Sequence, residues 1–237
     1  MIIAFKMFRN MVKQITREMM MVMLVIAPLL IGLLIKIGIP LLESKLLVHY
    51  GMQEILVPYY ELFSWLFAMV IGILFAFVGG LVVLGEIDEN VTRYLIVTPV
   101  GIRGYLFSRI GIPALLSGVV AFLLIPLASL CKIDIITLAV MVVSNTLSGI
   151  VTAFLVVAVS TNKVEGMAVG KLAGLFGATF FIPLLIKGWV KYIFCLFPMY
   201  YVGKWSLEGG ALNLVLTCIL FAGWIGGLYL RFQRKCK

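Results

Sequence analysis

Residues 62–85 read LFSWLFAMVIGILFAFVGGLVVLG, a run of 24 residues without a charged side chain. A helix rises about 1.5 Å per residue and the hydrocarbon core of a bilayer is about 30 Å thick, so about 20 apolar residues span it. Lipid offers no hydrogen-bond partners, so the backbone of a span must be satisfied by a helix or a closed barrel. An uninterrupted apolar run of this length favours a transmembrane helix over a barrel strand.

Five further runs of similar length and hydropathy occur in the chain. The six predicted spans are residues 19–42, 62–85, 110–131, 135–162, 167–186 and 209–230. The first run exceeds the apolar core of a cleavable signal peptide and lacks a small-residue cleavage pattern, so we expect it to remain as an anchor. The sequence thus predicts an all-α, polytopic membrane protein, with residues 1–237 forming a single transmembrane domain.

The composition excludes a soluble globular protein. Apolar residues make up 63% of the chain, against about 45–50% in ordinary soluble domains, and charged residues make up 12%, about half the usual share. The formal net charge is +9, but the basic residues lie between apolar runs and form no continuous patch. We therefore expect membrane lipid as the surroundings and no nucleic-acid partner.

The distribution of Lys and Arg predicts the orientation. With six spans, both termini lie on one side of the membrane, and thirteen of the 19 Lys and Arg residues fall on that side. Because short cytoplasmic loops carry the excess of positive charge, the sequence predicts a multi-pass protein of the inner or plasma membrane with both termini in the cytoplasm.

Residues 1–18 have the periodicity of an amphipathic helix. One face carries Ala4, Phe8, Met11, Val12 and Ile15, and the other carries Lys6, Arg9, Asn10, Lys13 and Arg17. Such a segment is typical of an interfacial helix resting among lipid headgroups. It could serve as an anchor, as a lever beside a cytoplasmic partner, or as both.

The densest charge cluster follows the second span, where residues 85–100 read GEIDENVTRYLIVTPV. Acidic residues at 86, 88 and 89 favour the start of a helix through its dipole, and the Thr-Pro pair at 98–99 favours its end. The pattern predicts a short helix lying across the cytoplasmic face. The alternative is a solvated loop whose carboxylates cap helix ends.

This segment resembles the one that follows the second span in ABC-2-type permeases, the membrane subunits of ATP-binding cassette exporters. In that comparison Glu86 and Asp88 occupy the acidic positions, Leu95 to Val97 the apolar run and Thr98-Pro99-Val100 the closing step. Asn90 stands in place of the usual turn glycine, and asparagine is the residue that next best tolerates a left-handed backbone. Val91, Thr92 and Arg93 depart from the family pattern. The six spans and the N-terminal helix extend the resemblance over the whole chain.

The resemblance implies a coupling role and a set of partners. The residues expected to contact an ATPase are Glu86, Asp88, Glu89, Asn90, Arg93, Leu95, Thr98 and Pro99. The implied assembly pairs this chain with a second permease chain, as a homodimer or a similar heterodimer, and with two copies of an ATPase subunit. That ATPase would bind ATP and Mg²⁺, and no cofactor is expected in this chain.

The outer segment between the fifth and sixth predicted spans is rich in aromatic residues and contains two apolar stretches too short to cross a membrane. The residues concerned are Trp189, Tyr192, Phe197, Pro198, Tyr200, Tyr201 and Trp205. The family resemblance implies a pair of short re-entrant or interfacial helices here. The alternative is an ordinary aromatic belt at the headgroup level.

The sequence offers no pattern for catalysis. A phosphate-binding G-x-x-x-x-G-K-[ST] loop is absent, and the nearest stretch, residues 166–172, has the wrong spacing. His49 is the single histidine, and the four cysteines show no metal-ligand spacing. We therefore expect no catalytic residues, no bound metal and an ATPase on a separate polypeptide.

Polar residues cluster in the fourth predicted span, at Ser144, Asn145, Thr146, Ser148 and Thr152. Such side chains often hydrogen-bond between helices, and less often line a substrate pathway. Charged residues are essentially missing from the centres of the spans, which argues against an ion-coupled carrier.

The favoured hypothesis is therefore an exporter permease for an amphipathic or hydrophobic substrate, such as a drug, a lipid or an antimicrobial peptide. One alternative is a secondary transporter or channel that works without an ATPase. Another is a subunit of a sensing or immunity complex with the same fold. An intramembrane enzyme is least favoured, because its paired Glu and His residues are missing from the spans.

Overall fold

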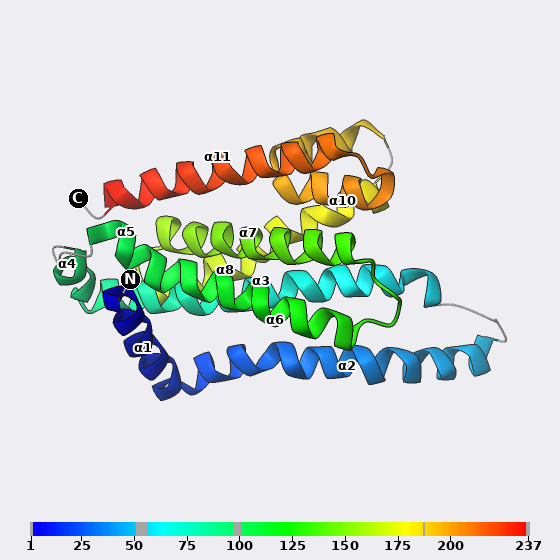
Figure 1. The fold of residues 1–237 in the computed structure, drawn as a ribbon, viewed down its shortest axis with the longest axis horizontal. Helices are drawn as coiled ribbons and strands as arrows, with labels where there is room; N and C mark the ends of the chain where they lie inside the picture. The colour runs from blue at the N-terminus through cyan, green and yellow to red at the C-terminus, as the bar shows by residue number, and fades with distance from the viewer. Residues whose placement is uncertain (1, 51–55, 97–100, 187, 236–237) are drawn as a thin grey trace.

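The computed structural model describes residues 2–50, 56–96, 101–186 and 188–235, and within these ranges the chain forms helices and no strands (Figure 1). Six helices are long and apolar enough to cross a membrane, which confirms the predicted all-α architecture with six spans. They are Met21–Val48, Val57–Asp88, Gly101–Ala128, Ile135–Val159, Lys163–Leu185 and Ala211–Lys235.

These spans are built from shorter elements. The chain begins with α1 (Ile2–Arg17) and α2 (Met19–Tyr50), which meet at Glu18. The central elements are η1 (Val57–Tyr59), α3 (Tyr60–Asp88), α4 (Val91–Ile96), α5 (Gly101–Leu106), the π-helical turn η2 (Phe107–Gly111), α6 (Ile112–Ala128) and α7 (Ile135–Val159). The last are α8 (Lys163–Ala178), η3 (Thr179–Phe181), α9 (Ile182–Leu185), η4 (Trp189–Leu196), α10 (Pro198–Glu208) and α11 (Ala211–Lys235).

Helix α3 forms the centre of the bundle. It packs against α2, α6, α7 and α8, and it contributes large buried side chains such as Trp65, Phe67 and Leu84. Helices α2 and α11 lie on opposite outer sides in Figure 1, and each exposes several large apolar side chains. An apolar surface of this extent fits acyl chains as its surroundings.

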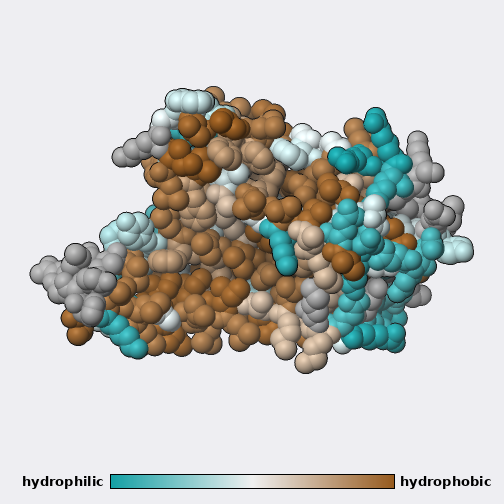
Figure 2. All heavy atoms as spheres, turned by 180° about the vertical axis from the view of Figure 1, so that it is seen from behind, coloured by the Kyte–Doolittle hydropathy of each residue, from teal (hydrophilic) through white to brown (hydrophobic). Residues whose placement is uncertain are grey.

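Polar residues gather at one end of the face that Figure 2 shows, while hydrophobic residues cover most of the middle of that face. We call this the terminal end, because α1, α4, α5 and the C-terminal part of α11 all lie there (Figure 1). The opposite end carries η1, η4 and α10.

Most spans extend beyond the apolar runs that predict them, and two of these extensions contain a buried charge. The first helix continues past residue 42 because Glu43 is buried and paired: its carboxylate accepts hydrogen bonds from the Tyr60 hydroxyl and from the backbone N–H groups of Leu56 and Val57. The third helix starts at Gly101 instead of residue 110 because Arg109 is also buried and paired. Charges therefore interrupt the apolar run without ending the helix, since each has a partner.

The polar cluster of α7 faces the bundle. Ser144, Asn145, Ser148 and Thr152 are buried, and Asn145 lies against Gly72 of α3. A Cβ atom on Gly72 would come within 2.1 Å of the Asn145 side-chain oxygen and 2.6 Å of its backbone carbonyl oxygen. The missing side chain at Gly72 thus allows α3 and α7 to approach closely, as small residues commonly do in membrane helices.

We predict that Gly72→Ala lowers the thermal midpoint of the purified protein in detergent, because a backbone oxygen at 2.6 Å cannot rotate away. The cost of such overpacking is about 1–3 kcal/mol. Gly174→Ala is the matched control, because a Cβ atom there meets nothing within 4 Å. Equal midpoints for the two variants would contradict the close contact between α3 and α7.

Candidate functional site

The turn between α3 and α4 has the left-handed geometry that the resemblance to ABC-2-type permeases implies. Asn90 adopts a positive φ of 58° between the end of α3 and the start of α4 at Val91. The N–H of Glu89 donates to the carbonyl of Gly85 and that of Asn90 donates to the carbonyl of Ile87, which closes the last turn of α3. Asparagine is one of the few residues that occupies this left-handed region readily, so the turn forms without glycine.

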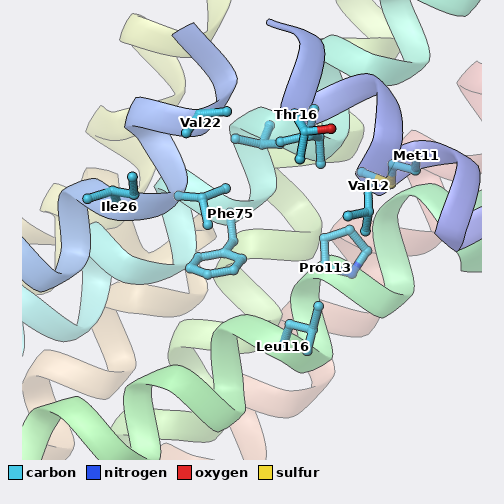
Figure 3. Close-up of a pocket in the computed structure, with 11 residues that line it drawn as sticks. Met11, Val12, Thr16, Val22, Ile26, Phe75, Pro113 and Leu116 are labelled. Atoms are coloured by element: carbon cyan, nitrogen blue, oxygen red, sulfur yellow. The ribbon is translucent and has the colours of Figure 1, made fainter. Parts of the chain in front are cut away.

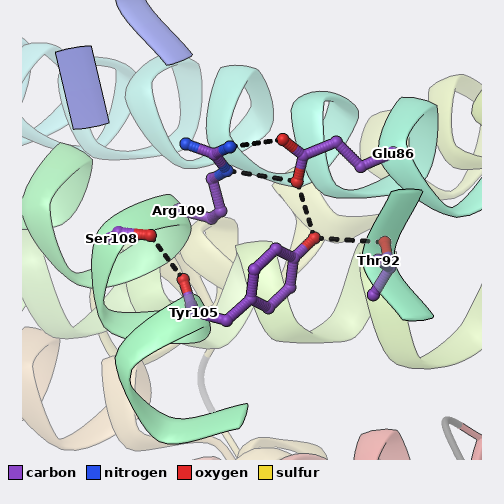
Figure 4. A network of polar contacts seen from close by, with 5 residues as sticks. All are labelled: Glu86, Thr92, Tyr105, Ser108 and Arg109. Carbon is purple, nitrogen blue, oxygen red and sulfur yellow. Dashed lines mark hydrogen bonds and ion pairs between the residues drawn. The ribbon is translucent and has the colours of Figure 1, made fainter. Parts of the chain in front are cut away.

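A buried polar network holds this turn in place (Figure 4). Arg109 of η2 pairs with Glu86 of α3 through two of its guanidinium nitrogens, with 3.1 Å between Nε and Oε2. The Tyr105 hydroxyl donates to the same Oε2 at 2.8 Å, and the Thr92 hydroxyl lies 3.3 Å from the Tyr105 hydroxyl. The network therefore joins α3, α4, α5 and η2.

The members of this network are withdrawn from the surface. Glu86, Thr92 and Arg109 are each 4% exposed, and Tyr105 is fully buried. A planar guanidinium that meets a carboxylate through two bonds fixes both the distance and the angle between their helices. Glu86 is accordingly held by its internal partners and almost completely shielded from solvent.

The neighbouring acidic residues have different surroundings. Asp88 and Glu89 are both exposed, and Asp88 Oδ2 accepts a hydrogen bond from the backbone N–H of Lys163, 3.0 Å away at the start of α8. The Lys163 side chain in turn pairs with Glu18 between α1 and α2. These bonds tie the α3–α4 turn to α8 and to the junction of α1 and α2.

A polar groove of about 500 Å³ lies between α1 and the α3–α4 turn. Its lining residues are Asn10, Lys13, Arg17, Glu18, Glu86, Glu89 and Val91. Glu86 and Glu18 have internal partners, so Glu89 is the acidic side chain that faces outward beside the basic residues of α1. The groove thus offers charges of both signs at the terminal end.

The structure describes two of the four other residues that are predicted to contact an ATPase. Arg93 and Leu95 belong to α4, the short helix that the sequence predicts after the turn. Thr98 and Pro99 lie outside the described residues. Glu86, Asp88, Glu89 and Asn90 are brought together around the turn, with the distinct surroundings given above.

The aromatic segment at the opposite end consists of two short helices, η4 and α10, separated at Phe197. Helix α10 packs into the bundle, with Pro198 and Tyr200 buried, whereas Trp189 and Tyr192 of η4 are exposed. Phe197 stacks on Trp224 of α11 with 5.9 Å between ring centroids. Tyr201 and Trp205, also on α10, are half-buried.

The predicted pathway-lining residues form internal contacts. The Thr146 hydroxyl donates to the Val142 carbonyl at 2.9 Å and the Ser144 hydroxyl is within reach of the Met141 carbonyl at 3.3 Å. Ser148 is buried, and both polar side-chain atoms of Asn145 lack a hydrogen-bond partner. Ser144 also lines a recess of about 220 Å³ between α7 and α11, whose walls are largely apolar.

The thiols and acidic groups of the described residues provide no further chemistry. Cys131, Cys195 and Cys218 are free thiols, and burial raises the pKa of the Cys131 thiol, so this group is protonated at neutral pH. No group of three His, Cys, Asp or Glu side chains within the described ranges is placed to hold a metal ion.

Comparison with known proteins identifies the family. Residues 11–232 match the family described as fluoroquinolones export permease protein Rv2686c-like. The chain belongs to this family. Two relatives, from Mycobacterium tuberculosis strains H37Rv and CDC 1551, are both named fluoroquinolones export permease protein, and each is 26% identical over 229 residues that cover 90% of both chains. No solved structure matches the chain.

Family membership confirms that this protein is an export permease of the membrane, in keeping with the resemblance to ABC-2-type permeases. The match includes α1 from residue 11, the α3–α4 turn and all six spans.

Several members of the site are not apparent from the sequence. Tyr105 and Arg109 lie 19 and 23 residues from Glu86, and Arg109 resembles an ordinary positive charge flanking an apolar run. The available signal is that Glu86 ends one span and Arg109 begins the next. Consecutive antiparallel spans bring such ends to the same side of the membrane, where opposite charges can pair.

Removing one partner of the buried pair should be more damaging than removing both. We predict that Glu86→Ala lowers stability by about 3–5 kcal/mol, since it leaves the Arg109 guanidinium buried without its carboxylate. The double variant Glu86→Leu with Arg109→Met should recover much of this loss. Thermal unfolding of the three proteins in detergent measures the difference.

The exposed Lys204–Glu208 pair, with 3.6 Å between Nζ and Oε2, provides the control for the comparison of these variants. Glu208→Ala should cost less than about 1 kcal/mol, because solvent screens an exposed pair. If Glu86→Ala were as mild as Glu208→Ala, the buried network would not be holding α3 against η2.

The conformation of Asn90 leads to a second prediction. Asn90→Gly should preserve both the α3–α4 turn and export, whereas Asn90→Val should weaken export, because a β-branched residue at a φ of 58° is strained by about 1–2 kcal/mol. Export activity in cells producing equal amounts of each protein checks this. Equal efflux for glycine and valine would show that the turn geometry is immaterial.

Proposed function

We propose that this chain is the membrane subunit of an ATP-driven exporter, and that its terminal end faces the cytoplasm and engages a separate ATPase. The excess of Lys and Arg at that end supports the orientation. The sequence carries no phosphate-binding loop, so the hydrolysis would take place on the partner.

The observation that carries this proposal is the anchored turn between α3 and α4. Helix α4 has only six residues, and an isolated helix that short is not stable in water. The contact of Thr92 with Tyr105, backed by Glu86 and Arg109, joins α4 to the core. A partner that displaces α4 would therefore also move α3 and the helix formed by α5, η2 and α6, which suits the transmission of force.

The proposed contact surface consists of α4, the exposed Asp88 and Glu89, and the polar groove beside α1. Charges of both signs in the groove favour a polar segment of a protein over a purely apolar one. In this mechanism ATP binding closes two ATPases against each other, and two permease chains alternate between inward-open and outward-open states.

The proposed cargo is an amphipathic aromatic drug of the fluoroquinolone class, by analogy with the printed names of the relatives. The scarcity of charge in the spans suits a substrate with a large apolar surface. Affinity purification of the tagged chain from its own cells should recover a protein with a phosphate-binding loop, and inside-out vesicles should accumulate fluoroquinolone when ATP is supplied. Accumulation by liposomes containing the purified chain and only an ion gradient would instead establish a secondary transporter.

Charge reversal in the groove tests the docking surface. Glu89→Lys should weaken recovery of the ATPase and ATP-dependent drug uptake by about tenfold or more, because like charges across an interface cost several kcal/mol. Glu208→Lys, which reverses a charge at the opposite end, is the control and should leave both quantities unchanged. Full activity of Glu89→Lys would show that the groove is not part of the docking surface.

A further inference from the structure

A second recess, of about 230 Å³, lies under the apolar face of α1 (Figure 3). Helices from four parts of the chain form its walls. Its lining includes Met11 and Val12 of α1, Val22 and Ile26 of α2, Phe75 of α3 and Pro113 of α6. It is separate from the polar groove, which borders the side of α1 that carries Asn10 and Arg17.

The apolar lining of this recess favours a hydrocarbon group as its occupant. Thr16 supplies the polar side-chain atom of the lining, and its hydroxyl already donates to the Lys13 carbonyl at 3.0 Å. A bound water requires two to four polar partners, which these walls do not offer. The same deficit disfavours the charged carboxylate and amine of a zwitterionic drug.

The recess opens sideways toward the apolar surface of the bundle. Its innermost residues, Met11 and Val78, are 0% and 3% exposed, whereas Val12, Ile26 and Leu116 at the rim are each 40% exposed. In a protein that spans a bilayer, such a rim meets the acyl chains of lipids. A chain can therefore enter from the membrane without crossing a polar surface.

Charge completes the site. Arg9 and Lys13 are exposed on α1 and follow Val12 and Thr16 around the helix, and Lys13 also lines the polar groove. Helix α1 contains no acidic residue, and of the acidic side chains that share the polar groove with Lys13, Glu18 and Glu86 pair with Lys163 and Arg109. Basic residues at the margin of an apolar surface attract anionic headgroups, with about 1 kcal/mol for each Lys or Arg.

We propose that this recess binds an anionic membrane phospholipid, with one acyl chain under α1 and the phosphate beside Arg9 and Lys13. The lipid would act as a wedge that sets the angle of α1 against α2, α3 and α6. The site involves the permease chain itself, so it can be tested without the ATPase and stands apart from the proposed function.

The experiment is native mass spectrometry of the purified chain after reconstitution in vesicles of equal phosphatidylglycerol and phosphatidylcholine. The wild-type chain should retain one phosphatidylglycerol in preference to phosphatidylcholine. Ile26→Trp, which fills the recess, should abolish this retention, whereas Val215→Trp on the exposed face of α11 should leave it intact. Equal retention by both tryptophan variants would overturn the proposal.

Two further variants test the contact between the lipid headgroup and α1. Arg9→Gln and Lys13→Gln should each lower the preference for phosphatidylglycerol by about fivefold, which corresponds to about 1 kcal/mol, while a phospholipid is still retained. An unchanged preference would overturn the assignment of the phosphate. Release of the lipid by stoichiometric fluoroquinolone would also overturn the proposal, by making the recess a drug site.

A measurement on the unaltered chain guards against misfolded variants. Phosphatidylglycerol carrying a photoreactive diazirine in its acyl chain should label peptides of α1, α2 and α6 around the recess in preference to the exposed face of α11. Uniform labelling of all lipid-facing helices would show that no chain is held under α1.

Discussion

The ion pair between Glu86 and Arg109 is the interaction on which the terminal end of this protein depends. Glu86 lies near the end of α3 and Arg109 lies in η2, inside the third span, and each is almost completely shielded from water. A charge in such surroundings is very costly unless a partner of opposite sign meets it with good geometry. The pair therefore constrains where α3 ends, where the third span begins and how α4 is held between them.

The same constraint applies to two other charged side chains of the bundle. Glu43 accepts hydrogen bonds from Tyr60 and from two backbone N–H groups, and the Lys235 side chain donates to the Val157 carbonyl at the end of α7. At the terminal end these polar contacts link helices that are distant in sequence. A surface built in this way can respond as a unit when a partner protein moves one of its elements.

Helix α1 relates this polar end to the membrane. One side of it borders the polar groove near Glu89, and the other side covers the apolar recess above Val78 and Phe75. Because α1 lines both the groove and the recess, a change in its tilt would alter the shape of both. The amphipathic pattern of residues 1–18 thus acquires a structural meaning beyond simple attachment to the headgroups.

The sequence by itself determined the all-helical class, the six spans and the amphipathic first helix, while the family resemblance implied the turn at Asn90. These features follow from local hydropathy, length and backbone preference, which are properties of short segments. Only the tertiary structure decided that Glu86 is buried while Glu89 faces the groove, and that Tyr105, Thr92 and Arg109 complete the network. Those assignments depend on the rotation and depth of whole helices, which packing contacts such as Gly72 against Asn145 fix and which no single segment encodes.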